Sequence, residues 1–85
     1  MIAYLKGKIV KKSERGAILN AGNVGYFIHL SNSDLELLTE GEHEFFVHSH
    51  IRENAFDLYA FHDHLDLDFF RQLLSINGVG PKVAL

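Results

Sequence analysis

Apolar and polar residues alternate along most of the chain between residues 2 and 61, which is the pattern of half-buried β-strands. Clusters of glycine, asparagine and serine interrupt the alternation and predict turns, including a hairpin turn at Gly22-Asn23. Gly7, in the middle of the first alternating segment, predicts a bulge or a sharp coil in that strand. The predicted strands cover residues 2–11, 17–21, 24–30, 43–51 and 55–61.

The same alternation assigns the side chains of each strand to two faces. In the fourth predicted strand, one face carries Phe45, Val47, Ser49 and Ile51. His48 and His50 lie on the other face, together with Phe46. A short polar turn over residues 52–54 separates this strand from the fifth, so the last two strands are predicted to form a hairpin.

Helical spacing replaces the alternation in two places. Residues 31–34 offer several N-cap side chains before a helical turn over residues 35–38, and residues 65–76 have the period of an amphipathic helix. The apolar stripe of that helix is Leu65, Phe69, Leu73 and Ile76, joined by Phe70 and Leu74. Five strands with a helical turn between the third and the fourth match an OB-fold. We therefore predict a mainly β, five- to six-stranded Greek-key barrel over residues 1–62, followed by a C-terminal α-helix.

The segment after this helix carries the most specific local chemistry. Gly78 suits a positive φ, Gly80 lets another backbone come close, and Pro81 suits the first turn of a second helix. Free N–H groups of that helix beside the Lys82 ammonium favour a phosphate. This helix-hairpin-helix pattern grips nucleic-acid backbone without reading sequence, and its candidate binding residues are Gly78, Val79, Gly80 and Lys82. A plain helix–helix turn would use the same glycines.

The length of 85 residues limits the chain to one small domain and at most the start of another. The second helix has barely begun at Leu85, so we expect the chain to be cut from a longer protein, with residues 63–85 opening a truncated helix-hairpin-helix domain. No apolar run reaches the roughly 20 residues needed to cross a bilayer, and the N-terminus lacks a signal-peptide pattern. We therefore expect no membrane partner. The absence of cysteine fits a cytosolic location.

The net charge of −3 argues against a self-sufficient nucleic-acid binder, because such domains usually present a basic face. The charges are unevenly distributed along the chain. Residues 4–15 hold five basic residues and one acid, whereas residues 34–68 hold ten acids and a single base, Arg52. If the chain contacts DNA, its acidic half must face away from the DNA or repel it.

Histidine pairs are the candidates for metal chemistry. His48 and His50 leave the same face of a strand, and His62 and His64 flank Asp63. Because spacing fixes no third ligand, we expect no metal and no cofactor, and a histidine-based metalloenzyme is disfavoured. The sequence also has no nucleophile–base pair and no phosphate-binding P-loop, so we expect no catalytic activity of its own.

Aromatic residues leave a second class of function open. Tyr26, Phe27, Tyr59 and Phe61 would form a base-stacking platform if the chain were a general single-stranded nucleic-acid-binding OB-fold protein. Packing in the core or between subunits is the favoured interpretation of these four side chains.

Several short motifs follow one another in a specific order. They are Leu5-Lys6-Gly7, Gly22-Asn23-Val24-Gly25-Tyr26, Arg52-Glu53, Leu58-Tyr59-Ala60-Phe61 and Asn77-Gly78-Val79-Gly80-Pro81-Lys82. In this order and spacing they resemble the RuvA family, the Holliday-junction-binding subunits of the bacterial branch-migration machine. The resemblance covers the whole chain.

This resemblance implies a non-catalytic DNA-binding subunit in the bacterial cytoplasm. Such proteins are homotetramers that hold four-way junction DNA open for a RuvB-like ATPase motor, which they contact through a further domain. The resemblance also implies that Glu53 and Asn54 occupy the family's acidic pin, two acids on the turn between the last two strands that repel phosphates at the junction centre. Asn54 stands where the family usually has aspartate. Gly78, Gly80 and Lys82 match the backbone-binding loop of the family's first hairpin.

Overall fold

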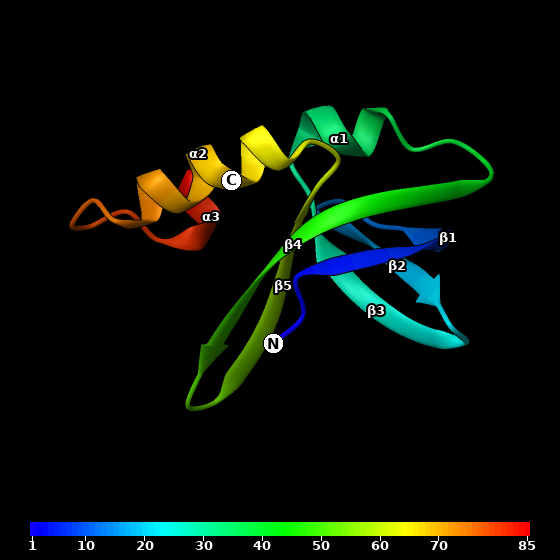
Figure 1. The fold of residues 1–85 in the computed structure, drawn as a ribbon, viewed down its shortest axis with the longest axis horizontal. Helices are drawn as coiled ribbons and strands as arrows, with labels where there is room; N and C mark the ends of the chain where they lie inside the picture. The colour runs from blue at the N-terminus through cyan, green and yellow to red at the C-terminus, as the bar shows by residue number, and fades with distance from the viewer.

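Five β-strands form a closed barrel in the computed structural model, which describes the backbone of residues 1–85 and every side chain except that of Val83. Neighbouring strands follow the order β1-β2-β3-β5-β4, and β4 pairs with β1 to close the barrel (Figure 1). The elements are β1 (Tyr4–Lys12), β2 (Gly16–Ala21), β3 (Val24–His29), α1 (Asn32–Glu36), β4 (Glu42–Arg52), β5 (Ala55–Phe61), α2 (His64–Leu74) and α3 (Pro81–Ala84). The predicted mainly β OB-fold barrel with a C-terminal helix is confirmed, with five strands.

Alternation of burial along β4 shows why this sequence closes into a barrel. Phe45, Val47 and Ser49 point inward and are buried, as the alternation predicts. Ser49 is the polar member of this row, and its hydroxyl is satisfied by the N-terminal segment. Its Oγ donates to the carbonyl of Ile2 at 2.7 Å and accepts from the Ile2 N–H at 3.0 Å. The N-terminus is thereby fixed across the inner row of β4.

The connection between β3 and β4 determines the topology. Ser31 accepts a hydrogen bond from the Asp34 N–H and caps α1, which begins three residues and ends two residues before the helical turn predicted over residues 35–38. Because this helix and β4 intervene, β3 meets β5 in parallel, with Ile28 opposite Leu58. All other neighbouring strands are antiparallel. The barrel therefore depends on a long-range pairing that no local hairpin provides.

The predicted turn at Gly22-Asn23 is confirmed. Both residues have positive φ, 59° for Gly22 and 65° for Asn23, as a two-residue hairpin turn with the twist of its strands requires. Glycine and asparagine tolerate this conformation better than other residues. The turn sets the register of β2 and β3, in which Ala21 lies opposite Val24.

The irregularity predicted at Gly7 has a different form from a bulge. The register of β1 against β2 shifts between Ile9 and Lys11, so the bulge lies three residues after Gly7 and the prediction of a bulge at Gly7 is wrong. Gly7 is instead buried where β1 coils tightly against β2. A Cβ at this position would lie 2.0 Å from the carbonyl oxygen of Asn20. The glycine is required because the two backbones leave no room for a methyl group.

The buried face of α2 includes Phe70 and Leu74 of the predicted apolar set but not Leu65, Phe69 or Ile76. Leu67 and Phe70 are buried and pack against Tyr59 and Phe61 on the outer face of β5, with Leu74 partly buried beside them. The predicted stripe residues Leu65, Phe69 and Ile76 are exposed. Apolar residues occur on both sides of this helix, so spacing alone does not identify the docking side. The side chains of β5 determine it by offering an aromatic surface.

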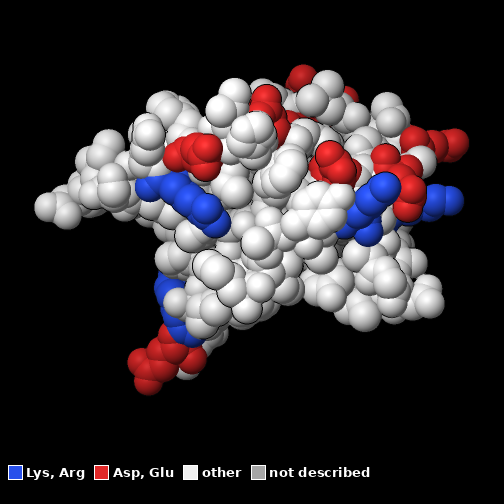
Figure 2. All heavy atoms as spheres, in the orientation of Figure 1, with Lys and Arg blue, Asp and Glu red and all other residues white. Residues whose placement is uncertain are grey.

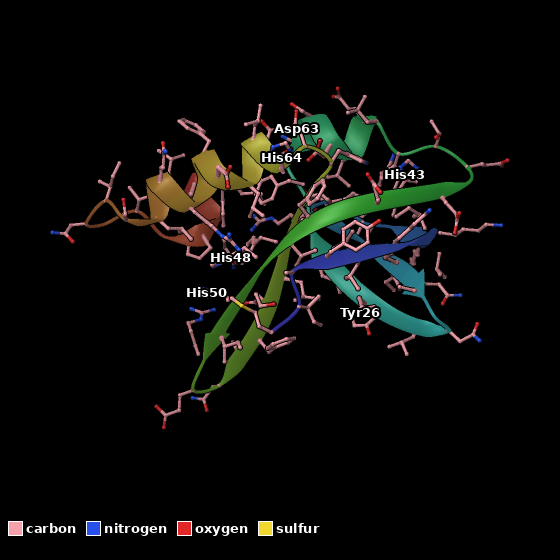
Figure 3. All side chains as sticks on the ribbon, viewed as in Figure 1. Tyr26, His43, His48, His50, Asp63 and His64 are labelled. Carbon is pink, nitrogen blue, oxygen red and sulfur yellow. The ribbon has the colours of Figure 1, made fainter. Side chains whose placement is uncertain are left out.

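Helix α2 is also shorter than predicted and ends at Leu74, with Ser75 as its C-cap. Asp63 caps the other end by accepting from the Leu65 N–H at 2.9 Å, and Figure 3 shows Asp63 and His64 at the start of the helix. Among the described residues, no helix combines the length and the hydrophobicity that a membrane crossing requires.

Candidate nucleic-acid interface

The β4–β5 hairpin extends beyond the barrel, as Figure 1 shows at the lower left. Its last two pairs join Ile51 to Phe56 and Arg52 to Ala55. Ile51 follows the inward row of β4 but is 62% exposed, because at this point the strand has left the core. The prediction that Ile51 shares a face with Phe45 is correct, but that face is covered only within the barrel.

The hairpin tip carries the two residues assigned to the acidic pin. Glu53 and Asn54 form the exposed turn between β4 and β5. The neighbouring Arg52 Nη2 lies 3.2 Å from Asp57 Oδ2, so the guanidinium is paired with a carboxylate on the adjacent strand. Among the described side chains, no ion pair includes Glu53. One cation and two carboxylates leave this end of the hairpin with a net charge of −1.

The loop between α2 and α3 has the predicted geometry. Gly78 has a φ of 85°, which confirms the positive value expected of it. The Val79 N–H donates to the Ile76 carbonyl at 3.2 Å, and the Ala84 N–H donates to the Gly80 carbonyl at 3.0 Å. Gly80 is the N-cap of α3 and Pro81 stands in its first turn. In the described chain, no side chain caps this end.

Gly80 leaves open space beside the loop. A Cβ built there would meet no heavy atom within 4 Å, so the close approach predicted at this glycine is not made by any described atom of this chain. The C-terminal end of α3 is attached to the rest of the protein, because Ala84 and Leu85 pack against the cluster that includes Tyr59, Phe61 and Phe70. The loop is therefore attached to the barrel on one side and open on the other.

A cavity of about 250 Å³ lies between the loop and the β4–β5 hairpin. Its walls come from both segments, Arg52 and Tyr59 from the hairpin strands and Gly80, Pro81 and Lys82 from the start of α3. Figure 2 shows the surface hollowed between the helices and the hairpin. Gly80 and Lys82 are thus brought together with the residue that precedes Glu53. Gly78, Val79, Glu53 and Asn54 are not among the lining residues.

His48 does not line this cavity and lies against α2, with its ring beside that of Phe70. Burial lowers the pKa of His48, and the nearby charges of Arg71 and His50 lower it further. Its Nδ1 accepts from Arg71 Nε at 3.4 Å. Figure 3 shows His48 and His50 on the same side of β4, as the alternation predicts. The neutral imidazole serves as an acceptor for the Arg71 guanidinium.

The histidines of the connector diverge instead of converging on a metal. His62 Nδ1 lies 3.1 Å from the buried Asp34 Oδ1, an ion-pair distance without the alignment of a hydrogen bond. Asp63 caps α2, and His64 lies beside the ring of Phe46. Among the described side chains, no three His, Asp or Glu residues gather as a metal site would need.

The aromatic base-stacking platform is not formed. Tyr59 and Phe61 are 2% and 5% exposed because α2 covers them, so neither ring is accessible to a base. Tyr26 packs against the barrel core, which leaves Phe27 as the exposed member of the proposed set. A single exposed ring does not make a stacking surface for successive bases. Packing in the core, the favoured interpretation, is confirmed for Tyr59 and Phe61.

Comparisons with known proteins agree with this geometry. The family described as "RuvA N terminal domain" matches residues 1–60. The chain is 42% identical to the "Holliday junction branch migration complex subunit RuvA" of Bdellovibrio bacteriovorus and 46% identical to that of Thermus thermophilus, with the whole chain and 45% of each relative covered. The protein of the same description from Halothermothrix orenii is 42% identical, with 44% of its length covered.

The chain thus spans slightly less than half the length of these curated relatives. The family match covers the barrel from its first strand into β5, and the motifs at Gly22-Asn23 and Arg52-Glu53 occupy the turns at which the structure places them. The chain belongs to the RuvA N-terminal domain family.

Proposed function

We propose that this chain is the junction-facing part of a DNA-binding subunit in a branch migration complex acting in recombination and repair. Residues 1–62 form its first domain and residues 63–85 begin its helix-hairpin-helix domain. The subunit holds a four-way junction open as a homotetramer in the bacterial cytoplasm, while a RuvB-like ATPase supplies the energy. It uses no cofactor and performs no covalent step. The observation that supports this most is the cavity shared by the Gly80–Lys82 loop and the projecting hairpin.

Gly78, Val79, Gly80 and Lys82 would hold the DNA backbone. The open space at Gly80 admits a phosphate close to the main chain, and the exposed Lys82 supplies a positive charge beside it. Contacts of this kind position a duplex without distinguishing bases. The low number of cations in the chain implies that a single copy binds weakly and that several copies act together.

Glu53 would act by repulsion. The hairpin tip has a net negative charge, and a phosphate that approaches it must be held away. Four such tips around a junction centre would keep the strands apart at the crossover. Asn54 adds no charge, so the negative charge of the pin in this chain comes from Glu53, with Asp57 as the next carboxylate along β5.

Removing the Lys82 ammonium tests the backbone contact. We expect Lys82→Ala in the full-length protein to weaken junction binding alike for every DNA sequence and to lower the slope of log K against log salt by about 1 per subunit engaged. Affinities for a four-way junction, a linear duplex and a single strand should be measured over a range of salt. Lys11→Ala, which removes an exposed lysine of β1, is the matched control. Equal affinity of the wild-type protein for single strands and junctions would contradict the proposal.

Removing the charge of Glu53 should raise the affinity for the junction, whereas removing that of Lys82 should lower it. We expect Glu53→Gln to leave folding intact and to tighten junction binding about threefold, because roughly 0.6 kcal/mol of repulsion is relieved. Branch migration by the assembled complex should change in the same variant. Glu36→Gln, an exposed acid on α1, controls for net charge. A Glu53→Gln protein that matches Glu36→Gln in affinity, salt dependence and branch-migration rate would rule out the pin.

A further inference from the structure

A second cavity, of about 370 Å³, lies beside the first, between the end of the barrel and α3. Its polar lining includes Arg15, His29, Asn32 and Lys82. Tyr59 and Lys82 line both cavities, so the two are contiguous around these side chains. The larger cavity therefore continues the hollow from the α2–α3 loop onto the barrel itself.

The charge of this lining is opposite to that of the chain. The net charge is −3, yet neither cavity has an aspartate or a glutamate among its lining residues. Asp57 lines neither cavity, and its carboxylate contacts two lining residues, His29 at 3.6 Å and Arg52 at 3.2 Å. Among the described side chains, Arg15 and Lys82 take part in no ion pair. Two full positive charges therefore remain available to an anion.

The barrel holds its share of the lining in place. The backbone at Arg15 is fixed on both sides, since the Leu30 N–H donates to the Arg15 carbonyl at 3.1 Å and the Ser13 N–H donates to the Gly16 carbonyl at 2.8 Å. His29 stacks on Tyr59 with ring centroids 4.9 Å apart. These contacts fix the backbone that carries Arg15 and the ring of His29, and both residues line the same cavity as Lys82.

We propose that this Arg15–Lys82 cleft binds a second phosphate of the nucleic-acid backbone. The phosphate lies between the Arg15 guanidinium and the Lys82 ammonium, with His29 and Asn32 beside it as further polar partners. A guanidinium presents two parallel N–H donors to phosphate oxygens, which suits a phosphodiester. This inference rests on the proposed function, because it extends the backbone contact of the loop from α3 onto the barrel. It assigns the barrel a direct share in DNA binding.

The test compares three variants of the full-length protein. We expect Arg15→Gln to weaken binding of a four-way junction and of a linear duplex about tenfold, as for the loss of one charge-assisted hydrogen bond, and to lower the salt slope by about 0.9 per subunit engaged. Arg15→Lys should recover the salt slope but only part of the affinity. Lys12→Gln removes the same charge from a nearby exposed position that lines neither cavity. Equal behaviour of Arg15→Gln and Lys12→Gln would overturn the proposal.

Inorganic phosphate separates this proposal from the proposed function. In an NMR titration of the full-length protein, phosphate should shift the resonances of Arg15, His29 and Lys82, and it should do so less in Arg15→Gln. Phosphate shifts without junction binding would mean that the anion site stands while the junction function fails. If junction binding depends on Lys82 but the Arg15 resonances do not respond to phosphate and Arg15→Gln binds normally, the junction function stands and the second phosphate site is wrong.

Discussion

Gly7→Ala is expected to destabilise the barrel by about 3 kcal/mol or more, the cost of severe overpacking, and to lower the melting temperature by roughly 12–24 °C. The added Cβ would lie 2.0 Å from the Asn20 carbonyl oxygen and 3.2 Å from the Ala21 Cα. Both neighbours are backbone atoms of β2, so no side chain can rotate away to make room. The two strands would have to separate at this position. Thermal and urea unfolding measure the effect.

Gly25→Ala is the matched control. Gly25 also lies within a strand, but its added Cβ would have as its nearest neighbour the Ile18 Cγ2 at 3.4 Å, an ordinary contact. Alanine there should be neutral or should stabilise by up to about 1 kcal/mol, through the reduced entropy of the unfolded chain. Equal stability of the two alanine variants would contradict the close approach of the β1 and β2 backbones at Gly7.

Phe70→Ala is expected to cost about 3–5 kcal/mol, the usual penalty for deleting a fully buried aromatic side chain. Phe70 is 1% exposed, and its ring centroid lies 5.0 Å from that of Phe61 and 5.4 Å from that of Tyr59. The substitution removes packing between α2 and the outer face of β5 and leaves the barrel interior unchanged. We therefore expect amide protection to vanish in α2 while β1, β2 and β3 remain protected, which hydrogen exchange detects residue by residue.

Phe69→Ala distinguishes this packing from a general effect of removing a ring. Phe69 is the next residue of the same helix and is 61% exposed, so its truncation should cost less than about 0.5 kcal/mol. In the full-length protein, Phe70→Ala should weaken junction binding more than duplex binding, because the loop loses its fixed place beside the hairpin. If Phe69→Ala proves the more damaging variant, the docking face of α2 is the one that the stripe of Leu65 and Ile76 predicts.

Features of the fold that depend on neighbouring residues were predictable from the sequence. The turn at Gly22-Asn23 and the positive φ of Gly78 follow from the conformational freedom of single residues. The strands follow from alternation, because one side of each faces the barrel core. The α2–α3 loop was predictable for the same local reason, since its chemistry lies within a few consecutive residues.

Features that depend on segments distant in the sequence were not predictable. The docking side of α2 is determined by Tyr59 and Phe61, and a helix with apolar residues on two sides carries no signal for that choice. The cleft between Arg15 and Lys82 joins residues from opposite ends of the chain. Arg15 belongs to a basic run that is typical of a solvated strand, and only the closure of the barrel brings it near α3. The sequence predicted that Gly7 is a special position in its strand. It did not predict that the backbone of β1 lies against the Asn20 carbonyl there, because Asn20 belongs to another strand.

The parallel pairing of β3 with β5 has a consequence for folding during synthesis. β2 and β3 can pair as soon as their hairpin emerges from the ribosome, but β3 has no partner on its other side until β5 follows. β1 likewise waits for β4. A nascent chain whose β3 has left the ribosome while β5 is still inside the exit tunnel would expose the edge of β3 and the inner face of an open sheet, a state prone to aggregation. Synonymous codons that shorten the time between the emergence of β3 and of β5, or chaperones that cover the exposed edge meanwhile, should raise the yield of folded protein without changing its stability.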